Sequence, residues 1–154
     1  MNLKSEVVRL QQKRYLEEQA QRQEEEDRRA RIQAKIESVG RQVEQLFAEA
    51  QEILWVDDDW EVTLRRGWEN QLHTSYVWRM TAERKEKKGL FIHRVAKVDI
   101  EELTIYFAPE ARRYPFSSPR LSYFTQEGLR EEVARQVLDL LEQRQKHKEV
   151  SDHF

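Results

Sequence analysis

Residues 32–66 have the sequence IQAKIESVGRQVEQLFAEAQEILWVDDDWEVTLRR, and the hydrophobic period changes within this stretch. From Ile32 to Ile53 the apolar positions recur at alternating steps of four and three, which is the period of an amphipathic helix. After the three consecutive aspartates, apolar and polar residues alternate, which is typical of a half-buried strand. The stretch therefore predicts a helix over 32–55 and a sheet that begins at Trp60.

Two kinds of partner suit the apolar stripe of this helix. The stripe completes three heptads of an a/d seam, which is the lower limit for a coiled coil; it consists of Ile32, Ile36, Val39, Val43, Leu46, Ala50 and Ile53. Phe47, Leu54 and Trp55 widen the apolar face, and this width favours packing on a sheet over pairing in a dimer seam.

Strand patterns continue after Trp60 up to residue 108. Short connections join them, and such connections allow only antiparallel neighbours. The prediction is a four-stranded antiparallel meander over residues 60–108, with strands over 60–65, 72–80, 90–98 and 103–107. The second strand has Leu72 on its apolar face, and a turn over 99–102 leaves Glu101 and Glu102 as solvated loop residues.

The remainder of the chain predicts a loop and a closing helix. Three prolines exclude regular structure between Ala108 and Arg120, so a loop is expected over 109–124, and Thr125 is suited to cap a helix over 126–146. That helix has an apolar face of Leu129, Val133, Val137, Leu140 and Leu141. The order of elements is α-ββββ-α, and its class is α+β.

Residues 1–31 differ from the α+β domain expected over 32–154. They are poor in apolar residues, and acidic side chains stand four positions before basic ones, which supports a solvated helix. The pairs are Glu18–Arg22, Glu24–Arg28, Glu25–Arg29 and Asp27–Arg31. We therefore expect a charged, projecting helical segment, either continuous with the next helix or separated from it at Gly40.

Composition excludes several classes of protein. Of 154 residues, 38 % are hydrophobic and 36 % are charged, and cysteine is absent, which excludes disulfides, thiolate metal sites and iron–sulfur clusters. The amino terminus has no apolar stretch typical of a signal peptide, and no run is long enough for a spanning helix. We expect a soluble, cytoplasmic protein with no membrane insertion.

Motifs for catalysis are absent from the sequence. Four scattered glycines form no phosphate-binding loop, and four histidines form no metal-ligand spacing, although His73 and His93 could approach each other on adjacent strands. The aspartates at 57–59 lack the spacing of a calcium loop and are expected to form a polar turn. The prediction is a protein that is not an enzyme and has no cofactor and no metal site.

Basic and aromatic residues are interleaved in the middle of the chain. Residues 60–124 contain 12 basic and 8 acidic side chains, whereas acidic residues are in excess on both sides. Cations with exposed rings are how single-stranded nucleic acid is often bound. The candidate residues are Arg65, Arg79, Arg84, Lys85, Lys87, Lys88, Arg94 and Lys97. The competing interpretation is that the rings belong to the core and the cations are solvated.

An amphipathic pattern near the amino terminus supports the preferred function. Leu3, Val7 and Leu10, with Leu16 behind them, predict a small apolar face that engages a groove on a protein partner, while a homo-oligomer would form across the seam of Ile32 to Ile53. We therefore expect a noncatalytic interaction or assembly protein. Single-stranded nucleic-acid binding is the alternative, and a small-ligand pocket between the long helix and the sheet is the third hypothesis.

Overall fold

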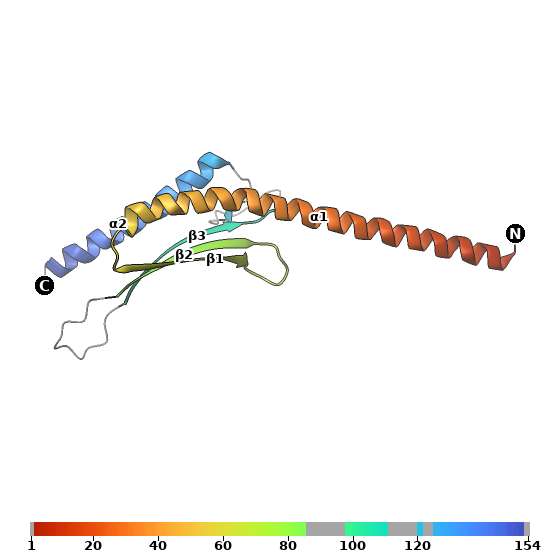
Figure 1. The fold of residues 1–154 in the computed structure, drawn as a ribbon, viewed down its shortest axis with the longest axis horizontal. Helices are drawn as coiled ribbons and strands as arrows, with labels where there is room; N and C mark the ends of the chain where they lie inside the picture. The colour runs from red at the N-terminus through yellow and green to blue at the C-terminus, as the bar shows by residue number, and fades with distance from the viewer. Residues whose placement is uncertain (1, 86–97, 111–119, 122–124, 153–154) are drawn as a thin grey trace. The chain divides into compact units, whose positions relative to one another are not determined.

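The computed structural model describes residues 2–85, 98–110, 120–121 and 125–152. The elements, in chain order, are α1 (Leu3–Leu54), β1 (Trp60–Trp68), β2 (Tyr76–Lys85), β3 (Val98–Phe107), β4 (Arg120–Leu121) and α2 (Gln126–Asp152) (Figure 1). By its internal contacts the chain divides into two compact units, Met1–Glu37 and Ser38–Phe154. Each unit is described separately below.

The first unit contains the amino-terminal part of α1. Its first turn is capped by Asn2, whose Oδ1 accepts a hydrogen bond of 2.9 Å from the backbone N–H of Ser5. Among the predicted charge pairs, Glu25 and Arg29 lie 3.3 Å apart, and Glu25 also pairs with Arg28 at 3.3 Å. Helix α1 passes through Gly40 without interruption, so residues 3–54 form one helix.

An antiparallel sheet of three strands forms one layer of the second unit. Strand β1 pairs with β2 over its full length, from Trp60 opposite Arg84 to Trp68 opposite Tyr76. Strand β2 then pairs with β3, and the two-residue β4 pairs in parallel with the end of β3. The predictions of an α+β class and an antiparallel sheet are confirmed, whereas the four-stranded meander is shown only in part.

Strand β2 pairs directly with β3, whereas the prediction placed a third strand over 90–98 between them. Except for Val98, the segment 90–98 is outside the described residues, and β2 is hydrogen-bonded directly to β3. The predicted turn over 99–102 is wrong, because these residues continue β3 in register with β2. Local sequence signals missed this start of the strand because an acidic residue, Glu101, lies on the face of the buried Leu103, whereas Ile100 is exposed.

The second strand begins later than predicted. Asn70 closes a turn before it: its Nδ2 donates to Thr74 Oγ1 at 2.6 Å, and its Oδ1 accepts from the Thr74 backbone N–H at 3.1 Å. Strand β2 therefore starts at Tyr76, and Leu72 is an exposed turn residue instead of a member of the apolar face. The hydrogen bonds of the Asn70 side chain stabilise a turn here, although apolar and polar residues alternate in the sequence.

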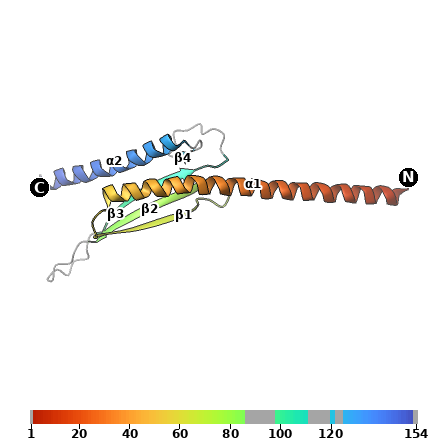
Figure 2. The same ribbon diagram turned by 45° about the horizontal axis from the view of Figure 1, so that its top comes forward.

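Both helices of the second unit lie on one face of the sheet, as Figures 1 and 2 show for the carboxyl-terminal part of α1 and for α2. The core lies between these layers, and its largest fully buried apolar side chains are Trp78, Phe47, Leu103, Ile105, Leu129 and Val43. Helix α2 is attached to β3 by Gln136, which bonds to the backbone N–H and C=O of Thr104 at 2.9 and 2.7 Å. Thr125 caps this helix as predicted, and α2 extends beyond residue 146 to Asp152.

Gly40 allows α1 to approach the sheet closely. A Cβ atom at this position would lie 3.2 Å from Nε1 and 3.3 Å from Cζ2 of Trp78, closer than most van der Waals contacts. Trp78 is fully buried on β2, so its ring has little room to move. The glycine therefore serves the packing of helix on sheet, and it does not break the helix.

We expect Gly40→Leu to lower the free energy of unfolding by about 2 kcal/mol or more, because the added side chain overpacks the contact with Trp78. Ala48→Leu is the matched control, since Ala48 lies on the exposed face of the same helix. Urea titration followed by tryptophan fluorescence measures both values. Equal stabilities of the two variants would contradict the close approach of α1 to β2.

Candidate interaction surface

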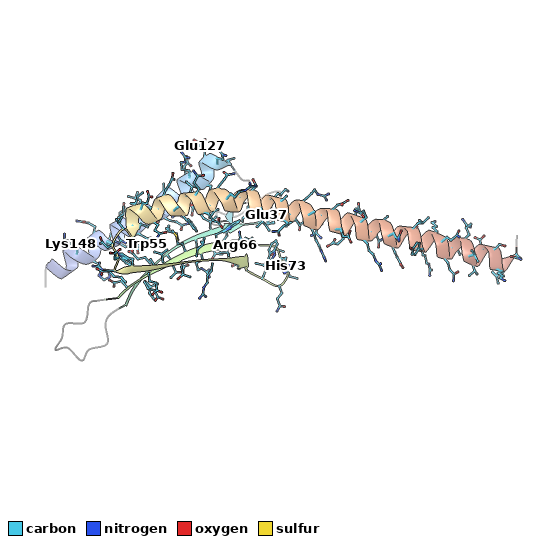
Figure 3. The ribbon with its side chains drawn as sticks, viewed as in Figure 1. Glu37, Trp55, Arg66, His73, Glu127 and Lys148 are labelled. Atoms are coloured by element: carbon cyan, nitrogen blue, oxygen red, sulfur yellow. The ribbon has the colours of Figure 1, made fainter. Side chains whose placement is uncertain are left out.

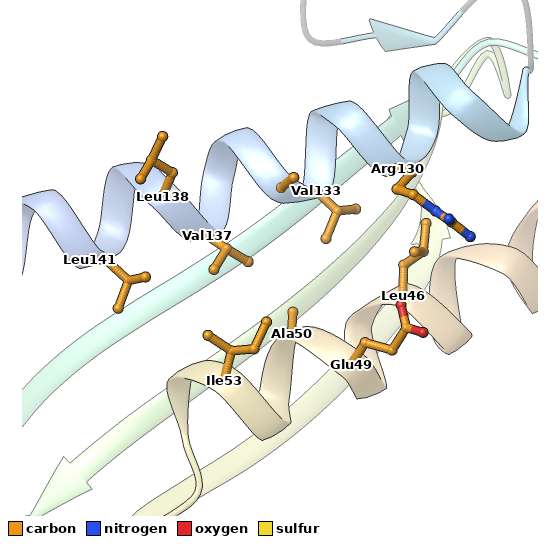
Figure 4. A pocket seen from close by; sticks show the side chains of 10 residues that line it. Leu46, Glu49, Ala50, Ile53, Arg130, Val133, Val137, Leu138 and Leu141 are labelled. Carbon is orange, nitrogen blue, oxygen red and sulfur yellow. The ribbon is translucent and has the colours of Figure 1, made fainter.

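An apolar groove runs between the carboxyl-terminal part of α1 and α2. Its volume is about 290 Å³. Helix α1 contributes Leu46, Glu49, Ala50 and Ile53, and α2 contributes Arg130, Val133, Ala134, Val137, Leu138 and Leu141 (Figure 4). The groove therefore lies between two helices, whereas the third hypothesis placed a pocket between a helix and the sheet.

The walls of the groove differ from its floor in exposure. Ala50, Val133 and Val137 are buried and form the floor, whereas Ile53 is 60 % exposed and Leu138 is 54 % exposed. Most large aliphatic side chains in folded domains are covered by other apolar groups. Together with the buried apolar floor, these two half-exposed aliphatic residues form an apolar patch on the surface of the second unit.

Carboxylates lie around one end of the groove. Glu49 and Arg130 line it, and a neighbouring hollow shares Arg130 and adds Glu127 and Glu131. Three acidic side chains thus accompany one basic side chain among the residues that line these two hollows. The charge favours an occupant that presents cations beside its apolar face.

The predicted partner-binding residues are exposed in the first unit. Leu3 is 81 % exposed and Leu16 is 64 % exposed, while Val7 and Leu10 are also exposed. A helix turns 100° per residue, so Leu3, Val7 and Leu10 share one face and Leu16 lies on the opposite side. Leu3, Val7 and Leu10 therefore form an exposed apolar face near the amino terminus.

The open face of the sheet brings together two of the predicted basic residues. Arg65 and Arg79 are directly opposite each other in the β1–β2 register. Arg79 is also engaged by β3: its Nη2 donates to Tyr106 Oη at 3.5 Å, and its Nε lies 3.0 Å from Glu102. The hydrogen bond to Tyr106, together with the charge of Glu102, raises the pKa of the Arg79 guanidinium above its ordinary value.

The other predicted basic residues are not joined to this pair. Arg84 lies on the opposite face of β2, where its guanidinium is 5.8 Å from the centre of the Trp60 ring. The side chain of Lys85 and the residues Lys87, Lys88, Arg94 and Lys97 lie outside the described part of the chain. The described residues therefore show a cationic pair on the open face and no continuous basic surface.

The aromatic rings of the strands lie mainly on the helix-covered face. Ring centres are 5.3 Å apart for Trp68 and Tyr76, 4.9 Å for Tyr76 and Trp78, and 6.3 Å for Trp78 and Phe107. On the same face, Arg66 pairs with Glu44 of α1 at 3.6 Å (Arg66 is labelled in Figure 3). Tyr106 is the aromatic residue that the described strands place on the open face beside Arg79.

A charged contact of Arg144, which no sequence pattern predicts, connects α1, β3 and α2. Arg144 donates from Nε to Glu101 Oε2 at 2.8 Å and from Nη2 to the carbonyl of Leu54 at 2.9 Å, and Nη2 also bonds Glu101 Oε1. Trp55 donates from Nε1 to the same Oε1 at 2.9 Å. Glu101 is thus a half-buried structural residue of β3. The helix period of α2 alone could not identify Arg144 as its partner.

The described residues contain no group of three or more potential ligands placed to hold a metal ion. His73 is in the turn before β2 with a positive φ of 55°, and it stacks on Trp68 at 4.9 Å (Figure 3). His93 lies outside the described residues, so their predicted approach stays a prediction. The aspartates at 57–59 form the turn between α1 and β1, as expected.

No family model matches this chain, and no curated protein or solved structure shows significant similarity to it. Within the described residues, neither helix carries an apolar stretch that could cross a membrane. Among the described surfaces, the groove between α1 and α2 combines a buried apolar floor with exposed aliphatic side chains.

Proposed function

We propose that this protein is a noncatalytic interaction protein and that its second unit binds a helical polypeptide segment in the groove between α1 and α2. The observation that carries this proposal is the exposure of Ile53 and Leu138 on either side of a buried apolar floor. Covering them with an apolar partner removes hydrocarbon from water, which is the main favourable term in such association.

The direction of the groove supports a helical occupant. Its lining residues recur along α2 at steps of three and four, from Arg130 to Leu141, so the groove follows the helix axis. A helix with anchors at i, i+4 and i+7 fits such a trough. The apolar face of Leu3, Val7 and Leu10 gives the chain a second interaction element, an amphipathic helix of the kind that binds in a groove.

Site-specific photo-cross-linking tests the groove. A benzophenone side chain replaces Leu138 in the full chain, and the matched control replaces Arg135, which is exposed on the same helix outside the groove. After irradiation in cell extract, we expect adducts with identifiable polypeptides at least tenfold more abundant from position 138 than from 135. Equal yields from both positions would contradict a docking groove.

Single-stranded nucleic-acid binding is the second candidate function. One observation favours it: Arg65 and Arg79 are adjacent on the open face, with Tyr106 beside Arg79. Two cations and a ring are the elements of a phosphate contact with base stacking. The ion pair between Arg79 and Glu102 opposes it, because a phosphate has to compete with that carboxylate.

Fluorescence anisotropy with a labelled single-stranded oligonucleotide tests this candidate. Binding through the open face should weaken steeply with salt and be lost in the double variant Arg65→Glu/Arg79→Glu. Arg66→Glu is the control, because Arg66 is on the helix-covered face. Equal loss in both variants would show that any binding depends on net charge and not on this face.

A further inference from the structure

We propose that the occupant of the groove is residues 3–14 of a second copy of this chain. This inference rests on the proposed function, since it names the partner of the same groove. The segment is helical within α1, and its apolar face of Leu3, Val7 and Leu10 is exposed. Each copy then supplies both a groove and the segment that fills one.

The apolar face of the segment fits within the length of the groove. At 1.5 Å per residue, the groove side of α2 from Arg130 to Leu141 is about 16 Å long. The apolar face from Leu3 to Leu10 is about 10 Å long, so it can lie entirely within the groove. Its three anchors occupy positions i, i+4 and i+7 on one face, the spacing used by helices that bind in grooves.

The charges of the two elements are also complementary. Residues 3–14 contain four basic side chains and a single acidic one, Glu6. The groove and its neighbouring hollow are lined by Glu49, Glu127 and Glu131 against Arg130. A basic amphipathic helix is therefore attracted to this surface before its apolar face makes contact.

The adjoining segment of the same helix does not fit the groove. Residues 17–27 contain six acidic side chains, one arginine and a single apolar residue, Ala20. This segment would meet the acidic lining with like charge and would offer no large apolar side chain to the floor. Of these two segments, the groove therefore favours residues 3–14.

A complementation experiment with the full chain tests the proposal. Val7→Asp disables the segment and leaves the groove intact, whereas Leu138→Asp disables the groove and leaves the segment intact. Both positions are exposed, so both variants should fold, which circular dichroism confirms. Gln12→Asp and Gln143→Asp add the same charge at exposed positions of α1 and α2 outside the two faces and are the matched controls.

Sedimentation equilibrium gives the result. We expect the wild-type chain and both controls to self-associate, and each disabled variant to do so at least tenfold more weakly. An equimolar mixture of Val7→Asp and Leu138→Asp should form a one-to-one complex, because one intact segment still meets one intact groove. Higher salt should weaken all of these complexes.

Three outcomes would overturn the inference: a monomeric wild-type chain at high concentration, equal weakening by the control variants, or no complex in the mixture. The proposed function can still hold when this inference is overturned. If the wild-type chain is monomeric while a cross-linker at Leu138 still captures a different polypeptide, the groove binds another protein and self-association is excluded. If the wild-type chain is monomeric and the cross-linker at Leu138 captures no polypeptide, both proposals are wrong.

Discussion

Val43→Asp should unfold the Ser38–Phe154 unit. Val43 is fully buried on the side of α1 that faces the sheet, among the largest buried side chains of the core. The substitution removes apolar contacts and places a carboxylate among side chains that are almost all apolar, at a cost of about 5 kcal/mol or more. This cost equals or exceeds the whole stability of many domains of this size.

Thermal melting followed by near-ultraviolet circular dichroism measures this effect. Gln45→Asp is the matched control, because Gln45 is exposed on the same helix and gains the same charge. We expect the control to keep a cooperative transition and the Val43→Asp variant to show none. A cooperative transition near the wild-type temperature in Val43→Asp would contradict the packing of α1 on the sheet.

Arg144→Ala should lower the free energy of unfolding, although by less than Val43→Asp. It breaks the ion pair with Glu101, removes the hydrogen bond to the carbonyl of Leu54 and uncovers the ring of Trp60, which lies 5.3 Å from the guanidinium. Arg144 is about one third exposed, with 34 % of its side chain accessible, so water partly replaces these contacts. We expect a loss of about 2–3 kcal/mol in the free energy of unfolding.

A double-mutant cycle separates the ion pair from the other contacts of Arg144. With Glu101→Ala as the second substitution, the coupling energy should exceed about 1 kcal/mol. The pair of Arg66 and Glu44 is the control, since its side chains are largely exposed and 3.6 Å apart, and its coupling should stay below about 0.5 kcal/mol. Equal coupling energies in the two cycles would show that Glu101 and Arg144 act as an ordinary surface pair.

The start of α2 and the helical period of α1 can be predicted because their signals are local. The start of α2 follows from the hydroxyl of Thr125, which accepts the backbone N–H of Gly128 at 3.0 Å. The apolar stripe from Ile32 to Ile53 likewise needs only a count of positions along the chain. These features involve residues three or four apart, so the sequence contains them directly.

Strand limits were predicted less well because they depend on pairing between distant residues. Glu101 has no local feature that distinguishes it from a loop residue, and its place in β3 is set by Ala82 on β2, its partner in the register. The hydrogen bonds to Glu101 come from Trp55 and Arg144, 46 and 43 positions away. Periodicity cannot relate residues separated by such distances.

The groove was missed for a similar reason. The sequence pattern places Ile53 and Val137 on apolar faces of two separate helices, and it does not show that these faces meet. The structure divides these faces: part of each packs on the core, and the remainder lines the space between α1 and α2. The useful signal was the width of the stripe on α2, where Leu138 extends the face beyond what the sheet can cover.

The four tryptophans, at positions 55, 60, 68 and 78, all belong to the second unit, and the Met1–Glu37 unit contains none. Tryptophan fluorescence therefore reports on the carboxyl-terminal part of α1 and on the sheet, whereas far-ultraviolet circular dichroism reports on all 52 residues of that helix and on α2. Comparing the two signals during denaturation measures how far helicity in residues 3–37 depends on an intact core. Coincident curves would make α1 a single cooperative element, and separate curves would assign its two parts independent stabilities.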